Sequence, residues 1–365
     1  MPTPGPVPWP RPEHTGAKHD IYRLYLERWF PILLSTNGYR SATYAEGFAG
    51  PGVYEGGEPG SPVIAVQALV DTPELVNSKK QTRFIFVDDD ERCTTRLNDE
   101  LTKNFPERPR PTDQMPVVIR KGTCAEALEE ELTKAHAWDQ PILAVLDSFG
   151  NVPVPHRLIE RLANNRASEV IVTFTPQHFI RFVTDMGPDV DEVFGHDPAW
   201  RQVAKLTEGE AKRRFLLTQY RKMLQATGFR YLLDFEMVDP RGASLYLVFG
   251  TNHEQGLRKM KEAAWKVDPN FGVMFRDPRD EQNEALFVVD DPQDAPLRRL
   301  LVEELRGKDW VSVIQLRRFA LFETVYREEH VLQALNRLRS SKTVEAQALG
   351  ILKLNGKVRL IEGAK

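Results

Sequence analysis

The ten residues from Thr43 to Gly52 constrain the fold of this chain more than any other stretch. A β-rich run ends there in Glu46, and two glycines, Gly50 and Gly52, follow closely. This pattern is typical of a strand that stops at a tight loop, where glycines let the backbone approach a ligand without a Cβ in the way. A dinucleotide fingerprint would need a third glycine where the chain has Glu55, so a pyrophosphate ligand is disfavoured. The alternative is an ordinary Gly/Pro turn in some α/β sheet.

The order Glu-x-Phe-x-Gly-x-Gly in this stretch resembles motif I of class I S-adenosylmethionine (SAM) methyltransferases. In that motif the acid meets the methionine end of the cofactor and no phosphate is bound. The resemblance implies that SAM is held by Glu46, Phe48, Gly50 and Gly52. Tyr54 follows in a Gly/Pro-dense loop where a substrate lid would lie, and we expect it to stack on or hydrogen-bond to a substrate.

A second acid follows the next predicted strand, residues 83–87. In Rossmann-like nucleoside sites an acid at this place accepts hydrogen bonds from the vicinal ribose hydroxyls, so we expect Asp88 to bind the ribose. Asp90 is the expected N-cap of the helix that follows. Ser61 is the expected N-cap of the preceding helix, with Pro62 at its first position.

The third and fourth predicted strands, residues 115–119 and 141–146, are each followed by polar residues. Methyltransferases commonly carry an Asp or Asn after the third strand, which contacts the adenine amino group. This chain has Thr123 and Cys124 there, so Thr123 or backbone groups would read the adenine. The fourth strand is the most apolar, as a strand buried on both faces of a parallel sheet is.

Asp147, Ser148 and Phe149 follow the fourth strand, where amino-methyltransferases carry Asp/Asn-Pro-Pro-Tyr/Phe. The resemblance implies that Asp147 touches the cofactor and holds, or takes a proton from, the methyl acceptor. Phe149 would stack on the acceptor. The alternative is that Asp147 only caps the next turn.

A fifth strand, residues 169–174, leads to His178 and Arg181, which we expect on the substrate side, although a lone His after a strand is more often structural. Strands at 231–238 and 244–250 then form a hairpin around an Asp-Pro-Arg-Gly turn. A terminal antiparallel hairpin after five β-α units closes the class I methyltransferase sheet. The sequence therefore predicts an α/β fold with a Rossmann-like, mostly parallel methyltransferase sheet.

The last seventy residues predict three helices followed by a β-hairpin, which is a winged-helix pattern. The helices are expected at 297–305, 312–323 and 328–340, and the hairpin at 350–354 and 358–361 around Asn355-Gly356. From Leu297 to Lys365 there are fourteen Lys and Arg against eight Asp and Glu, a surplus of six positive charges on a chain whose net charge is −3. This surplus suggests contacts with nucleic acid phosphates; protein docking is the alternative. The candidate basic residues are Arg317, Arg318, Arg327, Arg337 and Lys357.

Four segments follow from these patterns: a disordered Pro-rich arm (1–17), a methyltransferase-like domain (18–275), a linker (276–295) and a winged-helix-like domain (296–365). The composition, with 41% hydrophobic residues and no long apolar run, is that of an ordinary globular protein. The Pro-rich start is unlike a signal peptide, so we expect a cytoplasmic protein. Cys93 and Cys124 are the only cysteines, and no metal-ligand spacing is present, so no metal is expected.

The combined pattern is similar to the family of three-Cys-motif partner proteins (TcmP). The resemblance implies a methyltransferase-like fold, SAM as cofactor and a possible partner, a radical-SAM-like protein with a three-cysteine motif. The tail is often appended in such proteins. The residues that carry the resemblance are Lys18-His19-Asp20 to Tyr25-Leu26, Phe48 to Tyr54 with Gly60-Ser61-Pro62, Phe86-Val87-Asp88, Asp147-Ser148-Phe149-Gly150 and Ala264 to Pro269.

Three hypotheses follow. The first is a SAM-dependent methyltransferase of unknown acceptor, acting on nucleic acid or on a substrate that a partner delivers. The second is a non-catalytic partner protein with the same fold, which the departures at Thr123-Cys124 and Ser148 favour. The third, a metal-dependent nuclease using Asp88 to Asp90, is disfavoured because three consecutive residues at a strand end cannot all face one ion.

Overall fold

The computed structural model describes residues 5–72, 79–106, 114–148, 154–239, 242–270, 272, 274–276, 293–348 and 350–361. The chain forms two compact units. The N-terminal unit comprises Met1–Ala263 and Phe275–Glu284, and the C-terminal unit comprises Ala264–Met274 and Ala285–Lys365.

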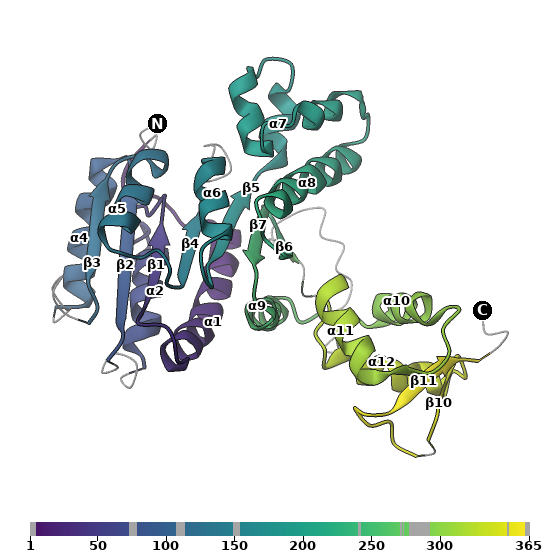
Figure 1. The fold of residues 1–365 in the computed structure, drawn as a ribbon. Helices are drawn as coiled ribbons and strands as arrows, with labels where there is room; N and C mark the ends of the chain where they lie inside the picture. Colours follow the sequence, from purple (N-terminus) through teal and green to yellow (C-terminus); the bar gives the residue numbers. More distant parts are fainter. Residues whose placement is uncertain are drawn as a thin grey trace. The chain divides into compact units, whose positions relative to one another are not determined.

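The N-terminal unit is built on an eight-stranded sheet with the strand order β3-β2-β1-β4-β5-β7-β6-β8. Strands β1 to β5 are parallel, and β7 lies antiparallel between β5 and β6. This order confirms the predicted Rossmann-like methyltransferase sheet with its closing hairpin (Figure 1). The strands are β1 (Ser41–Glu46), β2 (Gln81–Asp88), β3 (Val117–Lys121), β4 (Ile142–Leu146), β5 (Glu169–Phe174), β6 (Tyr231–Val238), β7 (Ser244–Thr251) and β8 (Met274–Arg276).

Helices cover both faces of this sheet, which is why the central strands β1, β4 and β5 are buried along their whole length. One face packs against η1, α5, α6 and α8, and the other carries α1, where Phe30 contacts Phe84 of β2. The helical elements are α1 (Glu13–Ser35), α2 (Ser61–Val70), α4 (Glu91–Asn104), η1 (Cys124–Leu128), α5 (Glu129–Lys134), α6 (His156–Ala163), α7 (Pro176–Phe182), η2 (Pro188–Phe194), η3 (Pro198–Lys205), α8 (Gly209–Ala226) and α9 (Glu254–Val267).

The sequence predicted the N-caps of α4 and α2, and the structure confirms the first prediction and contradicts the second. Asp90 is the N-cap of α4, and its carboxylate accepts a hydrogen bond from the Arg92 N–H at 2.9 Å. Gly60, rather than Ser61, is the N-cap of α2. The Ser61 hydroxyl instead donates to the buried carboxylate of Glu46 at 2.8 Å, because that carboxylate competes for it.

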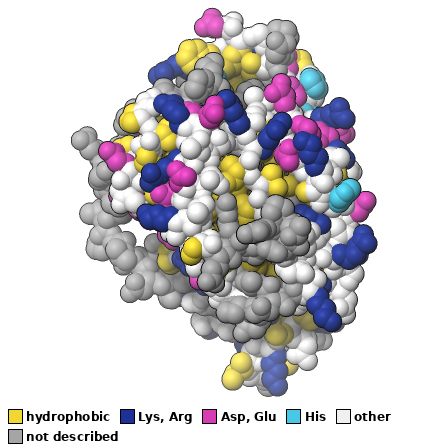
Figure 2. Space-filling model, turned by 90° about the vertical axis from the view of Figure 1, so that its left-hand side faces the viewer, with side chains coloured by type: hydrophobic (Ala, Val, Ile, Leu, Met, Phe, Trp, Pro, Cys, Tyr) yellow, Lys and Arg dark blue, Asp and Glu magenta, His cyan; other side chains and the backbone are white. Residues whose placement is uncertain are grey.

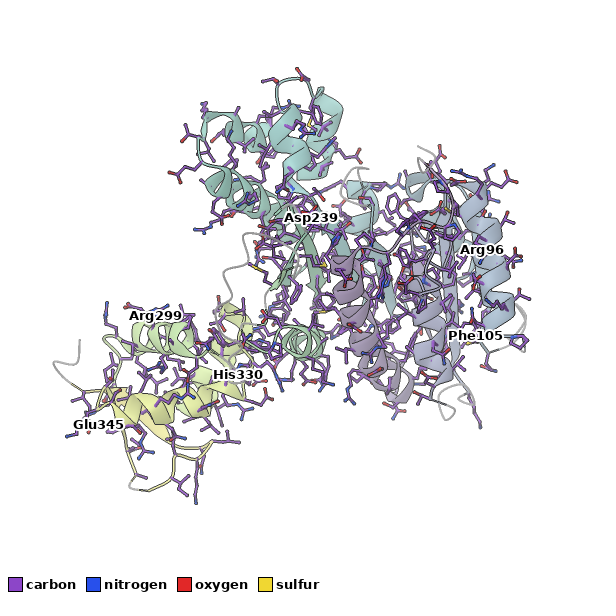
Figure 3. All side chains as sticks on the ribbon, turned by 180° about the vertical axis from the view of Figure 1, so that it is seen from behind. Arg96, Phe105, Asp239, Arg299, His330 and Glu345 are labelled. Carbon is purple, nitrogen blue, oxygen red and sulfur yellow. The ribbon has the colours of Figure 1, made fainter. Side chains whose placement is uncertain are left out.

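The outer edge of the sheet is polar. Figure 2 looks onto the side of α4 and β3, where basic and acidic side chains are interspersed. Lys121 of the edge strand pairs with Glu91 at 2.7 Å, and Arg96 pairs with Glu100 at 2.6 Å. Charges on an edge strand disfavour pairing with another sheet. Seen from behind, Arg96 marks α4 and Phe105 the end of that helix at this side of the sheet, and Asp239 marks the turn after β6 (Figure 3).

Within its described residues, the C-terminal unit contains three complete helices and a three-stranded antiparallel sheet, in the chain order helix, strand, helix, helix, strand, strand. The predicted hairpin at 350–354 is wrong: β11 pairs with residues 344–346, because this pairing places Val344 in the core of the unit. The elements are α10 (Ala295–Leu305), β9 (Val311–Ser312), α11 (Val313–Glu323), α12 (His330–Ser340), β10 (Val344–Ala346) and β11 (Lys357–Leu360). Across the described parts of both units, no helix is long and apolar enough to cross a bilayer.

Candidate functional site

A pocket of about 200 Å³ opens at the carboxyl ends of β1, β2, β3 and β4. Loops after parallel strands meet at this edge, and ligands of open α/β sheets bind there. Of the residues predicted to bind SAM, Phe48, Gly50, Gly52, Asp88, Thr123 and Asp147 all line the pocket, as does Tyr54. The topology thus brings together residues that lie up to a hundred positions apart in the sequence.

The loop after β1 is held against the tip of β2 by hydrogen bonds to Asp88. One carboxylate oxygen accepts from the Gly50 N–H at 2.7 Å, and the other accepts from the Asp90 N–H at 3.0 Å. Gly50 and Gly52 both have positive φ values, 64° and 72°, which glycine adopts at no steric cost. The Asp88 side chain therefore orders the glycine loop and still faces the pocket with lone pairs to spare.

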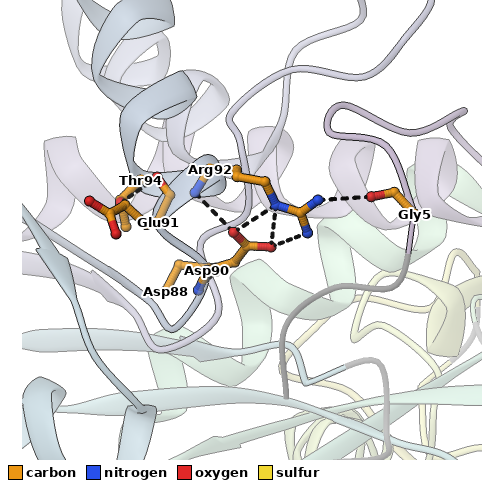
Figure 4. Close-up of polar contacts among 6 residues, drawn as sticks. All are labelled: Gly5, Asp88, Asp90, Glu91, Arg92 and Thr94. Carbon is orange, nitrogen blue, oxygen red and sulfur yellow. Dashed lines mark hydrogen bonds and ion pairs between the residues drawn. The ribbon is translucent and has the colours of Figure 1, made fainter.

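Burial raises the pKa of Asp88 although two backbone N–H groups stabilise its charged form. Beside it, the Arg92 guanidinium donates to both oxygens of Asp90 and also donates to the Gly5 carbonyl at 3.1 Å (Figure 4). The tip of β2 thus presents Asp88 and Asp89 to the pocket, and Asp90 holds the arginine that contacts the N-terminal arm.

Glu46 lies beneath the pocket rather than in its wall, and only 1% of its surface is exposed. Its carboxylate accepts from the Tyr44 hydroxyl at 2.7 Å and from the Ser61 hydroxyl at 2.8 Å. Burial raises the pKa of Glu46 to about 8, against the lowering effect of these two hydrogen bonds. Glu46 is therefore largely protonated at neutral pH, and a nearby cation would favour its ionised form.

Asp147 and Lys18 form a buried ion pair at the pocket that the sequence patterns did not predict. The Lys18 ammonium, 2% exposed, donates to one Asp147 oxygen. The other oxygen of Asp147 and Nδ1 of His19 are both buried and have no hydrogen-bond partner among the described residues. Burial and the Lys18 charge lower the pKa of His19 to about 3, so its ring is neutral. Unpartnered polar atoms at a pocket wall are groups that a ligand or water can satisfy.

Aromatic rings make up another side of the pocket. The His19 and Tyr54 rings lie 5.6 Å apart between centroids, and the Trp9 ring meets Tyr54 edge-on at 6.4 Å. Trp9 belongs to the arm that we expected to be disordered to residue 17, whereas α1 already begins at Glu13. In the sequence, the one indication that the arm packs against the rest of the protein is a single Trp among prolines.

The other predicted site residues lie differently. Thr123 lines the pocket, but its hydroxyl also caps η1 by accepting from the Glu126 N–H at 3.2 Å, so its reading of adenine stays a prediction. His178 and Arg181 lie on α7, and within the described residues neither lines the pocket. His178 packs instead at 5.3 Å from the Phe182 ring. Phe149 lies outside the described residues.

The residues present fit an adenosyl cofactor. Carboxylates, an unpartnered acceptor and a glycine loop line one cavity, as the ammonium, sulfonium and ribose hydroxyls of SAM require. No comparable set of ligands for a metal ion is seen: within the described residues, no group of three or more His, Cys, Asp or Glu is placed to hold one.

No protein-family model and no curated protein matches this sequence. Its structure is similar to the METTL16 MTase domain, at 10% identity over 64% of this chain and 68% of that chain, with a TM-score of 0.35. It is also similar to Trm1 from Pyrococcus horikoshii in complex with S-adenosyl-L-methionine, at 9% identity over 98% of this chain and 93% of that one (TM-score 0.40). EvdMO1 is similar at 11% identity over 64% of this chain, which spans 42% of the EvdMO1 chain (TM-score 0.33). The fold assignment rests on the strand order, not on these similarities.

Proposed function

We propose that this protein is a SAM-dependent methyltransferase whose acceptor is an amine or a hydroxyl. The observation that carries the proposal is that the glycine loop, Asp88 and Asp147 together line one pocket at the carboxyl edge of a methyltransferase-type sheet. When bound, SAM supplies a methyl group on a positively charged sulfur. Methyl transfer needs chiefly positioning, so the protein has to place two reactants rather than supply a nucleophile.

In this proposal each acid has its own task. Asp88 accepts from the ribose hydroxyls while it orders the Gly50 backbone. Asp147 holds the acceptor's N–H or O–H with its unpartnered oxygen and takes the proton that the acceptor loses. Lys18, on its other oxygen, fixes the orientation of that carboxylate. Phe149 stacking on the acceptor remains a prediction of the resemblance.

Calorimetric titration with SAM and S-adenosylhomocysteine (SAH) tests the proposal. We expect Asp88→Ala to weaken SAH affinity at least tenfold, worth ~1.4 kcal/mol or more, because a ribose contact and the loop anchor are both lost. Asp147→Ala should keep SAH binding and lose methyl transfer. Asp99→Ala, an exposed acid on α4, is the matched control and should bind as the wild type does.

Absence of binding of either ligand by the wild type would contradict the proposal. The hypothesis of a non-catalytic partner protein, which has the fold but does not bind the cofactor, would then be favoured. Binding that survives in Asp88→Ala would contradict only the ribose role of that residue.

We propose further that the C-terminal unit is a winged-helix module that docks a partner protein. Its element order and the sheet order β10-β11-β9 support the winged-helix assignment. Three of the five arginine and lysine residues expected to meet phosphates are paired with acids: Arg317 with Glu328, Arg327 with Glu329 and Arg337 with Asp294. The resemblance to TcmP proteins suggests the three-Cys-motif protein as that partner.

Exposed apolar side chains favour a protein over a nucleic acid as the partner of this unit. Ile351 is 88% exposed in the β10–β11 connection, and Leu354 and Ile314 are also exposed. Groups of exposed apolar side chains mark protein contact sites, whereas protein surfaces that bind nucleic acid are strongly positive.

A further inference from the structure

The N-terminal arm, residues 5–12, lies along the rim of the pocket and contacts three residues that neighbour the pocket lining. Gly5 accepts from Arg92, next to the tip of β2 (Figure 4). The Trp9 carbonyl accepts from the Glu55 N–H at 2.9 Å. Arg11 pairs with Glu58 at 3.8 Å. Two of these contacts fall on the loop that carries Tyr54, and the third falls on the first turn of α4, close to Asp88. The arm is therefore held by segments that also carry predicted ligand contacts.

The Trp9 side chain enters the pocket wall itself. It lines the cavity and is half-buried, and a Cβ added to Gly50 would lie 3.7 Å from its Cη2 atom. Its ring also meets Tyr54, which continues the wall towards His19. The arm thus covers the segment of the glycine loop where backbone and ligand are expected to meet.

The amino-acid composition of the arm favours a segment that stays bound at the rim of the pocket. Prolines at 6, 8, 10 and 12 restrict the backbone before it docks, so less conformational entropy is lost when the arm binds. A flexible Gly/Ser arm of this length would lose more entropy for the same few contacts.

We propose that the arm is part of the cofactor site and that Trp9 contacts the bound adenosyl cofactor. This inference rests on the proposed function and adds a residue that no methyltransferase motif in this sequence contains. Because Trp9 adds aromatic contact area without charge, its contribution is to affinity rather than to chemistry.

Calorimetric titration of the full chain with SAH tests this inference. We expect Trp9→Ala to weaken SAH affinity about five- to tenfold, the loss typical of one aromatic contact. Trp9→Phe keeps a ring in the wall and should stay within about threefold of the wild type. Trp138→Ala is the matched control: Trp138 stacks under Arg161 before β4, at the opposite edge of the sheet, and its loss should leave affinity unchanged.

Tryptophan fluorescence and hydrogen exchange give two further readouts. SAH should change the fluorescence of the wild type, and Trp9→Phe should remove most of that change while affinity is kept. Independently of ligand, the Glu55 amide, which donates to the backbone carbonyl of residue 9, should exchange slowly in the wild type. In Trp9→Ala it should exchange faster, because loss of the ring weakens the docking of the arm that carries this carbonyl.

The outcomes separate this inference from the proposed function. If the wild type binds SAH and Trp9→Ala binds equally well, the inference is overturned and the proposed function stands. If the wild type binds neither SAM nor SAH, both fail. A freely exchanging Glu55 amide in the wild type would show that the arm does not dock, and would also overturn the inference.

Discussion

Glu46 shows how one buried side chain ties the pocket to the stability of the fold. Its pKa is about 8 in the folded protein, against an ordinary 4.5. Between these values the folded state binds a proton at Glu46 that the unfolded state does not. The free energy of unfolding therefore falls as pH rises through this window, by up to ~1.4 kcal/mol per pH unit from this residue.

Glu46→Gln removes this proton from both states. As pH rises from 5.5 to 7.5, the free energy of unfolding of the variant should increase relative to that of the wild type by roughly 2 kcal/mol, as measured by urea unfolding. Glu55→Gln, at an exposed position, controls for the lost charge. A stability difference that stays constant across this pH range would show that Glu46 is ionised in the folded protein.

The site residues that could be predicted from the sequence are those that stand at the end of a predicted strand. Asp88 and Asp147 follow strands, and ends of parallel strands converge, so their meeting was predictable. Lys18 and Trp9 reach the pocket only because of how α1 and the arm pack, which no local pattern encodes. Ser61 was assigned by capping propensity, and a buried acid fifteen positions away overrode it.

At the scale of elements, the loop between β1 and α2 is the least tolerant part of the site. Gly52 has φ of 72°, and a Cβ there would lie 2.6 Å from Cδ1 of Leu97 on α4. An alanine would therefore meet both backbone strain, about 1–2 kcal/mol, and a neighbour that has to move.

We expect Gly52→Ala to destabilise the protein by about 2–3 kcal/mol and to weaken SAH binding, as measured by thermal unfolding and calorimetry. Gly57→Ala separates the two causes, because Gly57 also has a positive φ, of 87°, but nothing within 4 Å of an added Cβ. Equal losses in the two variants would mean that contact with Leu97 contributes little.

Strands were predicted more accurately than the hairpin of the C-terminal unit. Apolar runs such as β4 are buried on both faces, and their pattern leaves one interpretation. The Asn355-Gly356 dipeptide favours a turn, yet pairing was decided by which segment places Val344 in the core. Turn chemistry is local, and core packing overrides it.

At the scale of the whole molecule, the proposed functions assign the cofactor to the N-terminal unit and a partner protein to the C-terminal unit. If the C-terminal unit docks a protein, we expect DNA and RNA to bind weakly, with Kd above about 10 μM at 150 mM salt, measured by fluorescence anisotropy. Ile351→Asp should abolish binding of the three-Cys-motif protein in size-exclusion chromatography, and Lys357→Glu should not. Low-micromolar affinity for nucleic acid that falls steeply with salt would favour the nucleic acid alternative instead.

The burial of the two cysteines has a practical consequence for labelling experiments. Cys93 and Cys124 are both buried, and burial raises the pKa of Cys124 to about 12, so neither thiol is set up to react with alkylating reagents under native conditions. A cysteine introduced on the arm or on the β10–β11 connection would therefore take up a spectroscopic label selectively in the otherwise natural chain. Site-specific probes can then follow both parts of the molecule without first removing a native residue from the pocket wall.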